Sequence, residues 1–196
     1  MKRLMENAVK RWCIPIAALT ACALAVCIWT VHAAAQERER QRLPVMLNGG
    51  DGIYNPGFEQ WAGNAPVFWS CSDPKGVRKV ENDFQDGRTA LGMGPKYVFC
   101  NVSQTILVDG TLGGKKICFY AYAKANESEK VRIVVKIDEN NKGYSDFHPG
   151  DGTWCKLMVV YDVPPGLKPM TFEVILNHND NPQAATLFDK TCLWVE

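Results

Sequence analysis

Residues 131–137 read Val-Arg-Ile-Val-Val-Lys-Ile, with an apolar side chain at every second position. A period of two is typical of a β-strand with one buried face. The run Ile117-Cys-Phe-Tyr-Ala-Tyr-Ala123 is rich in β-formers, and the segments 157–161, 170–176 and 187–195 also favour strands. Turn residues such as Pro149-Gly150-Asp151-Gly152 separate these segments, and no useful helical period follows residue 43. The sequence therefore predicts an all-β fold, an antiparallel β-sandwich of the jelly-roll type.

The N-terminus has the layout of an export segment. Residues 1–11 are basic, residues 13–31 carry no charge, and Ala33-x-Ala35 fits a cleavage site. The apolar run is long for a signal peptide and close to the length of a spanning helix, so cleavage and anchoring both stay open. We expect a hydrophobic helix within residues 1–35, as signal peptide or membrane anchor, then a charged linker over 36–46 and one domain over 47–196. That domain would be secreted, periplasmic or anchored at the cell surface through residues 13–31.

The charge balance limits the choice of partner. The 196-residue chain carries 22 Lys and Arg against 21 Asp and Glu, a formal charge of +1. Without residues 1–35 the balance becomes 18 basic against 20 acidic residues, so the exported part is slightly acidic. This gives no electrostatic reason to expect nucleic acid as a partner. Membrane contact is expected only through the N-terminal segment.

The eight cysteines divide into three in the apolar N-terminal segment and five beyond it. Export would place the five in an oxidising compartment, where disulfides are allowed, and their odd number leaves at least one thiol outside any internal bridge. Cys118 and Cys192 share the outward parity of their strands, which makes them the candidate disulfide pair. Other pairings stay open.

Seven short motifs, in order along the chain, resemble one family. They are Asn55-Pro-Gly-Phe-Glu59, Asn64-Ala-Pro-Val-Phe-Trp69, Gly87-Arg-Thr-Ala-Leu91, Val102-Ser-Gln-Thr-Ile106, Ile117 to Ala125, Gly152-Thr-Trp154 and Phe188-Asp189-Lys-Thr-Cys-Leu193. Together they resemble carbohydrate-binding modules of the family 4/9, CenC-like type, over about residues 53–196. The resemblance implies a galactose-binding-like β-jelly roll without catalytic activity, of the kind that usually accompanies glycoside hydrolases. Lys190 and Thr191 depart from the family's closing Asp-Val pattern.

The resemblance also indicates which residues are structural. It places Trp69 and Trp154 at core positions, although an indole face is also a good platform for a sugar ring. The expected structural core comprises Phe58, Trp69, Gln104, Phe119 and Trp154.

Strand alternation supplies the candidate sugar-binding residues. Tyr120 and Tyr122 point away from the core side of their strand, and so do polar residues of the segments 131–137 and 170–176. If these strands form one sheet, tyrosines interspersed with polar side chains would offer flat apolar surface and hydrogen-bond partners for hydroxyls. The candidates are Tyr97, Tyr120, Tyr122, Arg132, Lys136, Glu173 and Asn177. The alternative is a solvated sheet face with cross-strand aromatic packing.

Glu59 and Asp189 lie at the two chain ends of the domain. In the family these positions resemble parts of a structural calcium site, and calcium is the only cofactor expected. Calcium takes six to eight oxygen ligands, whereas the sequence names two side-chain donors. The alternative is that the same carboxylates cap turns through hydrogen bonds.

Catalysis finds little support in the sequence. His148 and His178 are expected in loops without a recognisable nucleophile motif beside them. The leading hypothesis is an exported, non-catalytic module that binds a poly- or oligosaccharide on an exposed sheet face. A structural or adhesion jelly roll that binds a protein partner is the alternative, and a small glycosyl-bond hydrolase is a third reading.

Overall fold

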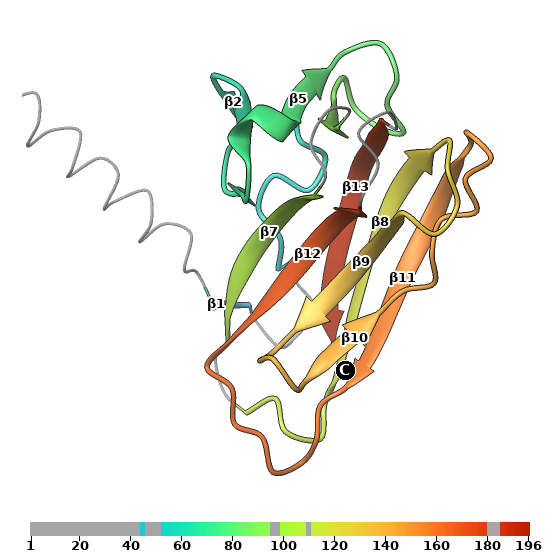
Figure 1. The fold of residues 1–196 in the computed structure, drawn as a ribbon. Helices are drawn as coiled ribbons and strands as arrows, with labels where there is room; N and C mark the ends of the chain where they lie inside the picture. Colours follow the sequence, from blue (N-terminus) through green and yellow to red (C-terminus); the bar gives the residue numbers. More distant parts are fainter. Residues whose placement is uncertain (1–43, 46–51, 95–98, 109–110, 180–184) are drawn as a thin grey trace, which may run out of the picture. The chain divides into compact units, whose positions relative to one another are not determined.

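The structure, a computed structural model, describes residues 44–45, 52–94, 99–108, 111–179 and 185–196. These residues form an all-β sandwich of two main sheets, together with a two-stranded ribbon (Figure 1). The predicted N-terminal helix and Tyr97 lie outside the described residues. Within the described residues, no helix has the length and apolar character needed to cross a membrane.

The first sheet is built around β7, with β12, β9 and β10 following in order on one side. The other side of β7 pairs with β1 and β4. The strand bounds are β1 Pro44–Val45, β4 Ser70–Cys71, β7 Phe99–Val108, β9 Val131–Lys136, β10 Lys142–Tyr144 and β12 Thr171–Asn179. Only the pairing of β1 with β7 is parallel among the described strands. Because β1 falls within 36–46, part of the predicted linker pairs with the domain.

The second sheet has the order β11-β8-β13-β6-β5 and is antiparallel throughout. Its strands are β5 Val77–Val80, β6 Ala90–Met93, β8 Lys116–Ala125, β11 Trp154–Asp162 and β13 Thr186–Val195. The ribbon is β2 Trp61–Ala62 with β3 Ala65–Pro66, and a 3-10 helix, η1, spans Pro74–Gly76. A β-bulge interrupts β13 between Asp189 and Cys192, where Lys190 has a positive φ of 47°.

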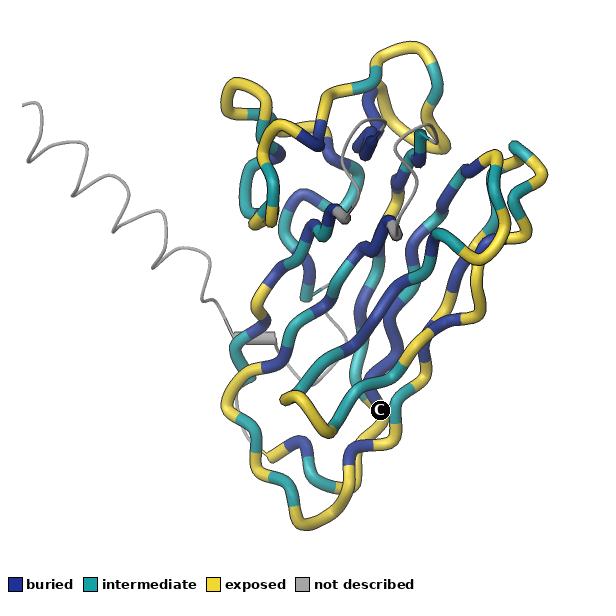
Figure 2. Tube along the Cα trace, viewed as in Figure 1, coloured by how far each residue is buried: buried dark blue, intermediate teal, exposed yellow. Residues whose placement is uncertain are grey.

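The core lies between the inner faces of the two sheets (Figure 2). On β8 the residues predicted to face inward are buried, whereas Tyr120 and Tyr122 are half-buried on the other side. On β9 the inward residues Val131, Ile133 and Val135 are buried as well. The period-two reading of both segments is therefore confirmed.

Four of the five expected core residues are confirmed. Phe58 and Phe119 are completely buried, Trp69 is 5% exposed and Gln104 is 3% exposed. Gln104 is satisfied because its Oε1 accepts from Tyr54 N at 2.9 Å and its Nε2 donates to two backbone carbonyls. The prediction for Trp154 is wrong: it is only half-buried on the outer parity of β11, and its Nε1 donates to Asp83 Oδ1 at 3.1 Å.

The predicted disulfide is also wrong, because Cys118 is a free thiol. The strand register explains this: Cys118 lies opposite Trp194, whereas Cys192 lies opposite Tyr120. Such diagonal positions are about 7–8 Å apart between Cα atoms, beyond the usual span of a disulfide.

Candidate functional site

The outer face of the first sheet carries three rows of side chains, because directly paired residues of an antiparallel sheet point to the same side. The first row is polar and comprises Asn101, Asn177 and Arg132. The middle row is mostly apolar and comprises Ser103, Ile175, Val134 and Tyr144. The third row is polar or charged and comprises Thr105, Glu173, Lys136 and Lys142. We call these three rows the first outer face.

A shallow pocket of about 240 Å³ lies on the first outer face. All three rows contribute to its lining, which comprises Asn101, Arg132, Val134, Lys136, Lys142, Tyr144, Ile175 and Asn177. Its floor is thus a strip of apolar side chains between two polar edges. Three of the sequence-predicted residues, Arg132, Lys136 and Asn177, line this pocket, and Glu173 lies in the third row beside Lys136.

The turn before β10 positions Tyr144 at the end of the middle row. Asp138 closes this turn by accepting hydrogen bonds from Asn140 N at 2.8 Å and Asn141 N at 3.0 Å. The Asn141 side-chain amide also donates to this carboxylate and is the largest cause of the lowered pKa of Asp138, followed by the backbone N–H of Asn140. The turn returns the chain so that Tyr144 pairs with Val134, where its side chain is 48% exposed.

The guanidinium of Arg132 contacts two aromatic rings. Its central carbon lies 4.2 Å from the ring centroid of Tyr144 and 5.0 Å from that of Phe147. Phe147 is brought there because the chain after β10 continues to bond β9, through Ser145 N to Ile133 O at 3.0 Å and His148 N to Val131 O at 2.9 Å. The rings orient the guanidinium by cation–π contact.

The first row holds two polar atoms that have no hydrogen-bond partner among the described residues. They are Nε of Arg132, a donor, and Oδ1 of Asn177, an acceptor. The two residues are directly paired across β9 and β12. Asn177 is 8% exposed, and its Nδ2 donates a hydrogen bond to Asn101 Oδ1 at 2.7 Å. Because an unpaired buried polar atom is destabilising, both atoms would gain from a ligand group that reaches them.

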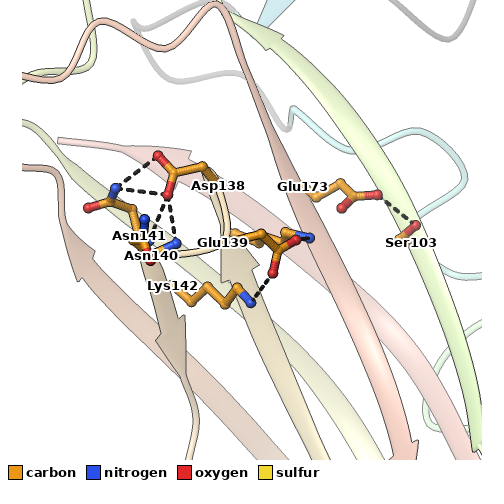
Figure 3. A network of polar contacts seen from close by, with 8 residues as sticks. Ser103, Asp138, Glu139, Asn140, Asn141, Lys142 and Glu173 are labelled. Carbon is orange, nitrogen blue, oxygen red and sulfur yellow. Dashed lines mark hydrogen bonds and ion pairs between the residues drawn. The ribbon is translucent and has the colours of Figure 1, made fainter.

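The third row is crossed by an ion-pair network (Figure 3). Glu139 bonds Lys136 Nζ at 2.5 Å and Lys142 Nζ at 2.7 Å. Hydrogen bonds and charge from these two lysines lower the pKa of the Glu139 carboxyl to about 2. Glu173 accepts from Ser103 Oγ at 3.2 Å across to β7. The lysines thus share one carboxylate, whereas Arg132 is in no ion pair within the part of the chain that the structure describes.

The structure does not bring the predicted tyrosines to this face. Tyr120 and Tyr122 lie on β8 of the second sheet, so they point outward on the opposite side of the sandwich. Their rings make an edge contact at 6.2 Å, Tyr120 makes another with Trp194 at 6.2 Å, and Lys156 Nζ lies 3.9 Å from the Tyr120 centroid. This is the cross-strand packing of the alternative reading, which occupies the Tyr120 ring with protein contacts.

Glu59 and Asp189 are both engaged by backbone N–H groups. Glu59 Oε1 accepts from Arg88 N at 2.7 Å and Thr89 N at 3.1 Å. Asp189 accepts from Gln85 N at 2.8 Å, Asp86 N at 2.9 Å and Lys190 N at 2.7 Å. Burial nevertheless raises the pKa of the Asp189 carboxyl.

These bonds are the turn caps of the alternative reading, whereas calcium takes six to eight oxygen ligands. In the described residues, no group of three or more His, Cys, Asp or Glu side chains gathers to hold a metal. Calcium at Glu59 and Asp189 stays a prediction.

Both histidines serve buried structural contacts. His178 lies in β12 and not in a loop as expected, and its Nδ1 is 2.7 Å from Thr186 Oγ1. His148 is completely buried, with Nε2 3.2 Å from Ala123 O and Nδ1 accepting from Gly150 N at 2.9 Å.

Two further hollows lie near the second sheet. One, of about 640 Å³, includes Asp83 and Lys124 in its lining, but these charges bond each other at 2.7 Å. The other, of about 350 Å³, lies at the β13 bulge and includes Tyr120. Neither lining contains an unpaired buried donor or acceptor among the described residues, so the first outer face is the stronger candidate.

Sequence reasoning missed five of the eight lining residues, Asn101, Val134, Lys142, Tyr144 and Ile175, together with Phe147, which contacts Arg132. Val134 and Ile175 are apolar residues at outward positions, a break in alternation that signals an apolar strip on an outer face. No periodic signal identifies Tyr144, because β10 is three residues long.

No protein-family model matches the sequence, and no curated protein matches it either. Solved structures share the fold at low sequence identity. A family 61 carbohydrate-binding module, solved with β-1,4-galactotriose, has a TM-score of 0.55 and 18% identity over 76% of this chain and 100% of its own. A cyclase from Fischerella sp. has a TM-score of 0.56 and 16% identity over 74% of this chain and 95% of its own.

An enzymatic domain of tailspike protein 4 from bacteriophage CBA120 has a TM-score of 0.57 and 15% identity, over 74% of this chain and 21% of its own. These likenesses show the fold alone. The domain is a β-sandwich of the jelly-roll kind found in carbohydrate-binding modules, and enzymes share that architecture.

Proposed function

We propose that this chain is an exported, non-catalytic module that binds a poly- or oligosaccharide on the first outer face. The observation that supports the proposal is an unpaired donor, Arg132 Nε, and an unpaired acceptor, Asn177 Oδ1, on two directly paired residues that line a pocket with an apolar floor. Export through residues 13–31 belongs to the proposal, on the sequence layout of that segment.

A sugar hydroxyl is the group that matches this pair. A hydroxyl accepts one hydrogen bond and donates another, so a single group can take the Arg132 N–H and give its own proton to Asn177 Oδ1. The desolvation cost of both protein atoms is recovered when such a ligand binds.

The middle row supplies the remaining part of sugar recognition. The C–H faces of a pyranose are apolar and pack against flat apolar surface, which Tyr144, Val134 and Ile175 offer as one strip. The polar rows on both sides then bracket the ring edges, where hydroxyls project. The family 61 module, solved with β-1,4-galactotriose, supports a sugar as the ligand of such a fold.

Binding to a panel of immobilised polysaccharides, with the full chain, tests this function. We expect Tyr144→Ala and Asn177→Ala each to weaken binding about tenfold or more, because each removes a part of the pocket. Tyr120→Ala is the matched control on the opposite face and should bind as the parent does.

Four results would contradict the proposal in different ways. Unchanged binding in both pocket variants would exclude the first outer face. Loss of binding only in Tyr120→Ala would move the site to the second sheet. Release of reducing sugar from a bound polysaccharide would show a hydrolase, and no glycan binding at all would favour the protein-binding alternative.

A further inference from the structure

The guanidinium of Arg132 is oriented but not neutralised. Its carbon lies 4.2 Å from the Tyr144 centroid and 5.0 Å from the Phe147 centroid, contacts that fix the plane of the group. Within the described residues it forms no ion pair with a carboxylate. Glu139, three residues before β10, is already shared by Lys136 and Lys142.

The unpaired atom is the one that matters for anion recognition. Nε and a terminal nitrogen form one edge of the guanidinium, and their two parallel N–H groups match the two oxygens of a carboxylate. Nε of Arg132 is buried without a partner among the described residues. A guanidinium gains more from a carboxylate than from a neutral hydroxyl, because the opposite charges attract and the two carboxylate oxygens accept from two N–H groups at once.

The charged residues of the pocket also favour an anionic ligand. The pocket lining contains three cations, Arg132, Lys136 and Lys142, and no acidic residue. Lys136 and Lys142 are compensated by Glu139, with Glu173 and Asp138 also close to Lys136. Among the described residues, the charge left without a carboxylate partner in this lining is therefore that of Arg132. A local excess of one sign attracts ligands of the opposite sign.

We propose that the sugar bound on the first outer face is a uronic acid residue of an acidic polysaccharide. Its carboxylate takes the Nε edge of Arg132, an adjacent hydroxyl donates to Asn177 Oδ1, and the ring packs on the Tyr144 strip. This inference rests on the proposed sugar-binding function and specifies the chemical class of sugar.

Methyl esterification provides a clean test, because it removes the charge of a uronate and keeps the ring. The full chain is titrated by calorimetry with polygalacturonate, polymannuronate and their methyl esters, and with neutral galactan, xylan and β-glucan. We expect at least one uronate polymer to bind about tenfold or more tightly than its ester, and the preference to shrink as salt is raised.

Two variants separate recognition from a general structural role. Arg132→Gln should abolish the preference for acid over ester, whereas a merely structural role would weaken both ligands equally. Arg132→Lys keeps the charge but loses the two-donor edge, and should retain only part of the preference. Lys156→Gln, a matched loss of one charge on the opposite face, should leave the preference unchanged.

The outcomes distinguish the preference for a uronic acid from the proposed sugar-binding function on which it rests. Binding of neutral glycans without a preference for uronates overturns the inference and leaves the sugar-binding function standing. Binding only of sulfated glycans, lost on desulfation, overturns the carboxylate assignment. Absence of binding to every polysaccharide overturns both.

Discussion

Asp189→Ala should destabilise the domain strongly, although the residue lies away from the proposed sugar pocket. Asp189 is completely buried at the β13 bulge and accepts three backbone hydrogen bonds of 2.7–2.9 Å, from Gln85, Asp86 and Lys190. Two of these donors belong to the loop between β5 and β6, more than 100 positions away in sequence. The carboxylate thus ties that loop to β13.

The magnitude follows from the three bonds. A hydrogen bond to a charged group contributes about 1.5–3 kcal/mol, and the loss is greatest when the donor stays buried. Gln85, Asp86 and Lys190 are exposed residues, so water can replace part of the lost bonding. We therefore expect a loss of about 2–4 kcal/mol in the free energy of unfolding, a large share of the 5–15 kcal/mol typical of a domain.

Urea denaturation followed by tryptophan fluorescence measures this loss. Asp189→Asn retains one acceptor and the side-chain shape, and should lose less than Asp189→Ala. Asp86→Ala, which removes an exposed side chain from the same loop, should change stability much less than Asp189→Ala. A loss below 1 kcal/mol for Asp189→Ala would refute the assignment of Asp189 as a clamp.

The same preparation tests the calcium prediction. If Glu59 and Asp189 hold calcium, EDTA lowers the melting temperature of the parent domain, and added calcium restores it. The turn-cap alternative, in which both carboxylates are held by N–H groups, predicts no shift. A clear fall with EDTA would overturn the turn-cap account.

Two further predictions concern the backbone and the thiols. Gly150→Ala should cost about 2 kcal/mol or more in urea denaturation, because Gly150 has a φ of +81° and a Cβ there would lie 2.1 Å from Ser128 N. Gly114→Ala, at a φ of +80° with no atom within 4 Å, is the matched control, and equal losses would contradict the steric part of the argument. Burial, with a smaller contribution from Cys100, raises the pKa of the Cys71 thiol from 9.0 to about 11. The folded state then keeps a proton that the unfolded state releases, so stability should be fully present below pH 9 and fall as the pH rises toward 11. Urea midpoints between pH 8 and 11 should fall less in Cys71→Ala, and identical slopes would refute the assignment to Cys71.

Much of the fold could be predicted because a β-strand with one buried face has a local signal, the alternation of apolar and polar residues. The segment 131–137 alternates so regularly that its buried and outward positions follow from the sequence, and the same holds for 117–123. Segments without this alternation could not be predicted in the same way. Nothing periodic marks β10, whose three residues are held by the Asp138 turn and by pairing with β9.

Burial of aromatic residues was predictable only where the residue lacks a competing contact. Trp69 packs in the core, with its ring centroid 5.2 Å from that of Phe58 and its N–H donated to Asn55 O. Trp154 lies on the outer parity of β11, paired with Lys124, and donates its N–H to Asp83. An indole satisfies both its apolar body and its donor in either place. Sequence resemblance could not separate these environments, since the partner Asp83 is 71 residues away.

The sequence by itself determined the all-β class, most strands and the direction in which Arg132, Asn177, Tyr120 and Tyr122 point along each strand. It could not determine which strands share a sheet. Residues 117–123 and 131–137 are neighbours in sequence, yet β8 pairs with β11 and β13, whereas β9 pairs with β12 and β10. The physical reason is that alternation is a property of one strand, whereas sheet membership depends on pairing across long sequence separations. That long-range pairing separated the tyrosines from Arg132, whereas the local turn through Asp138 brought Tyr144 to the strand of Arg132.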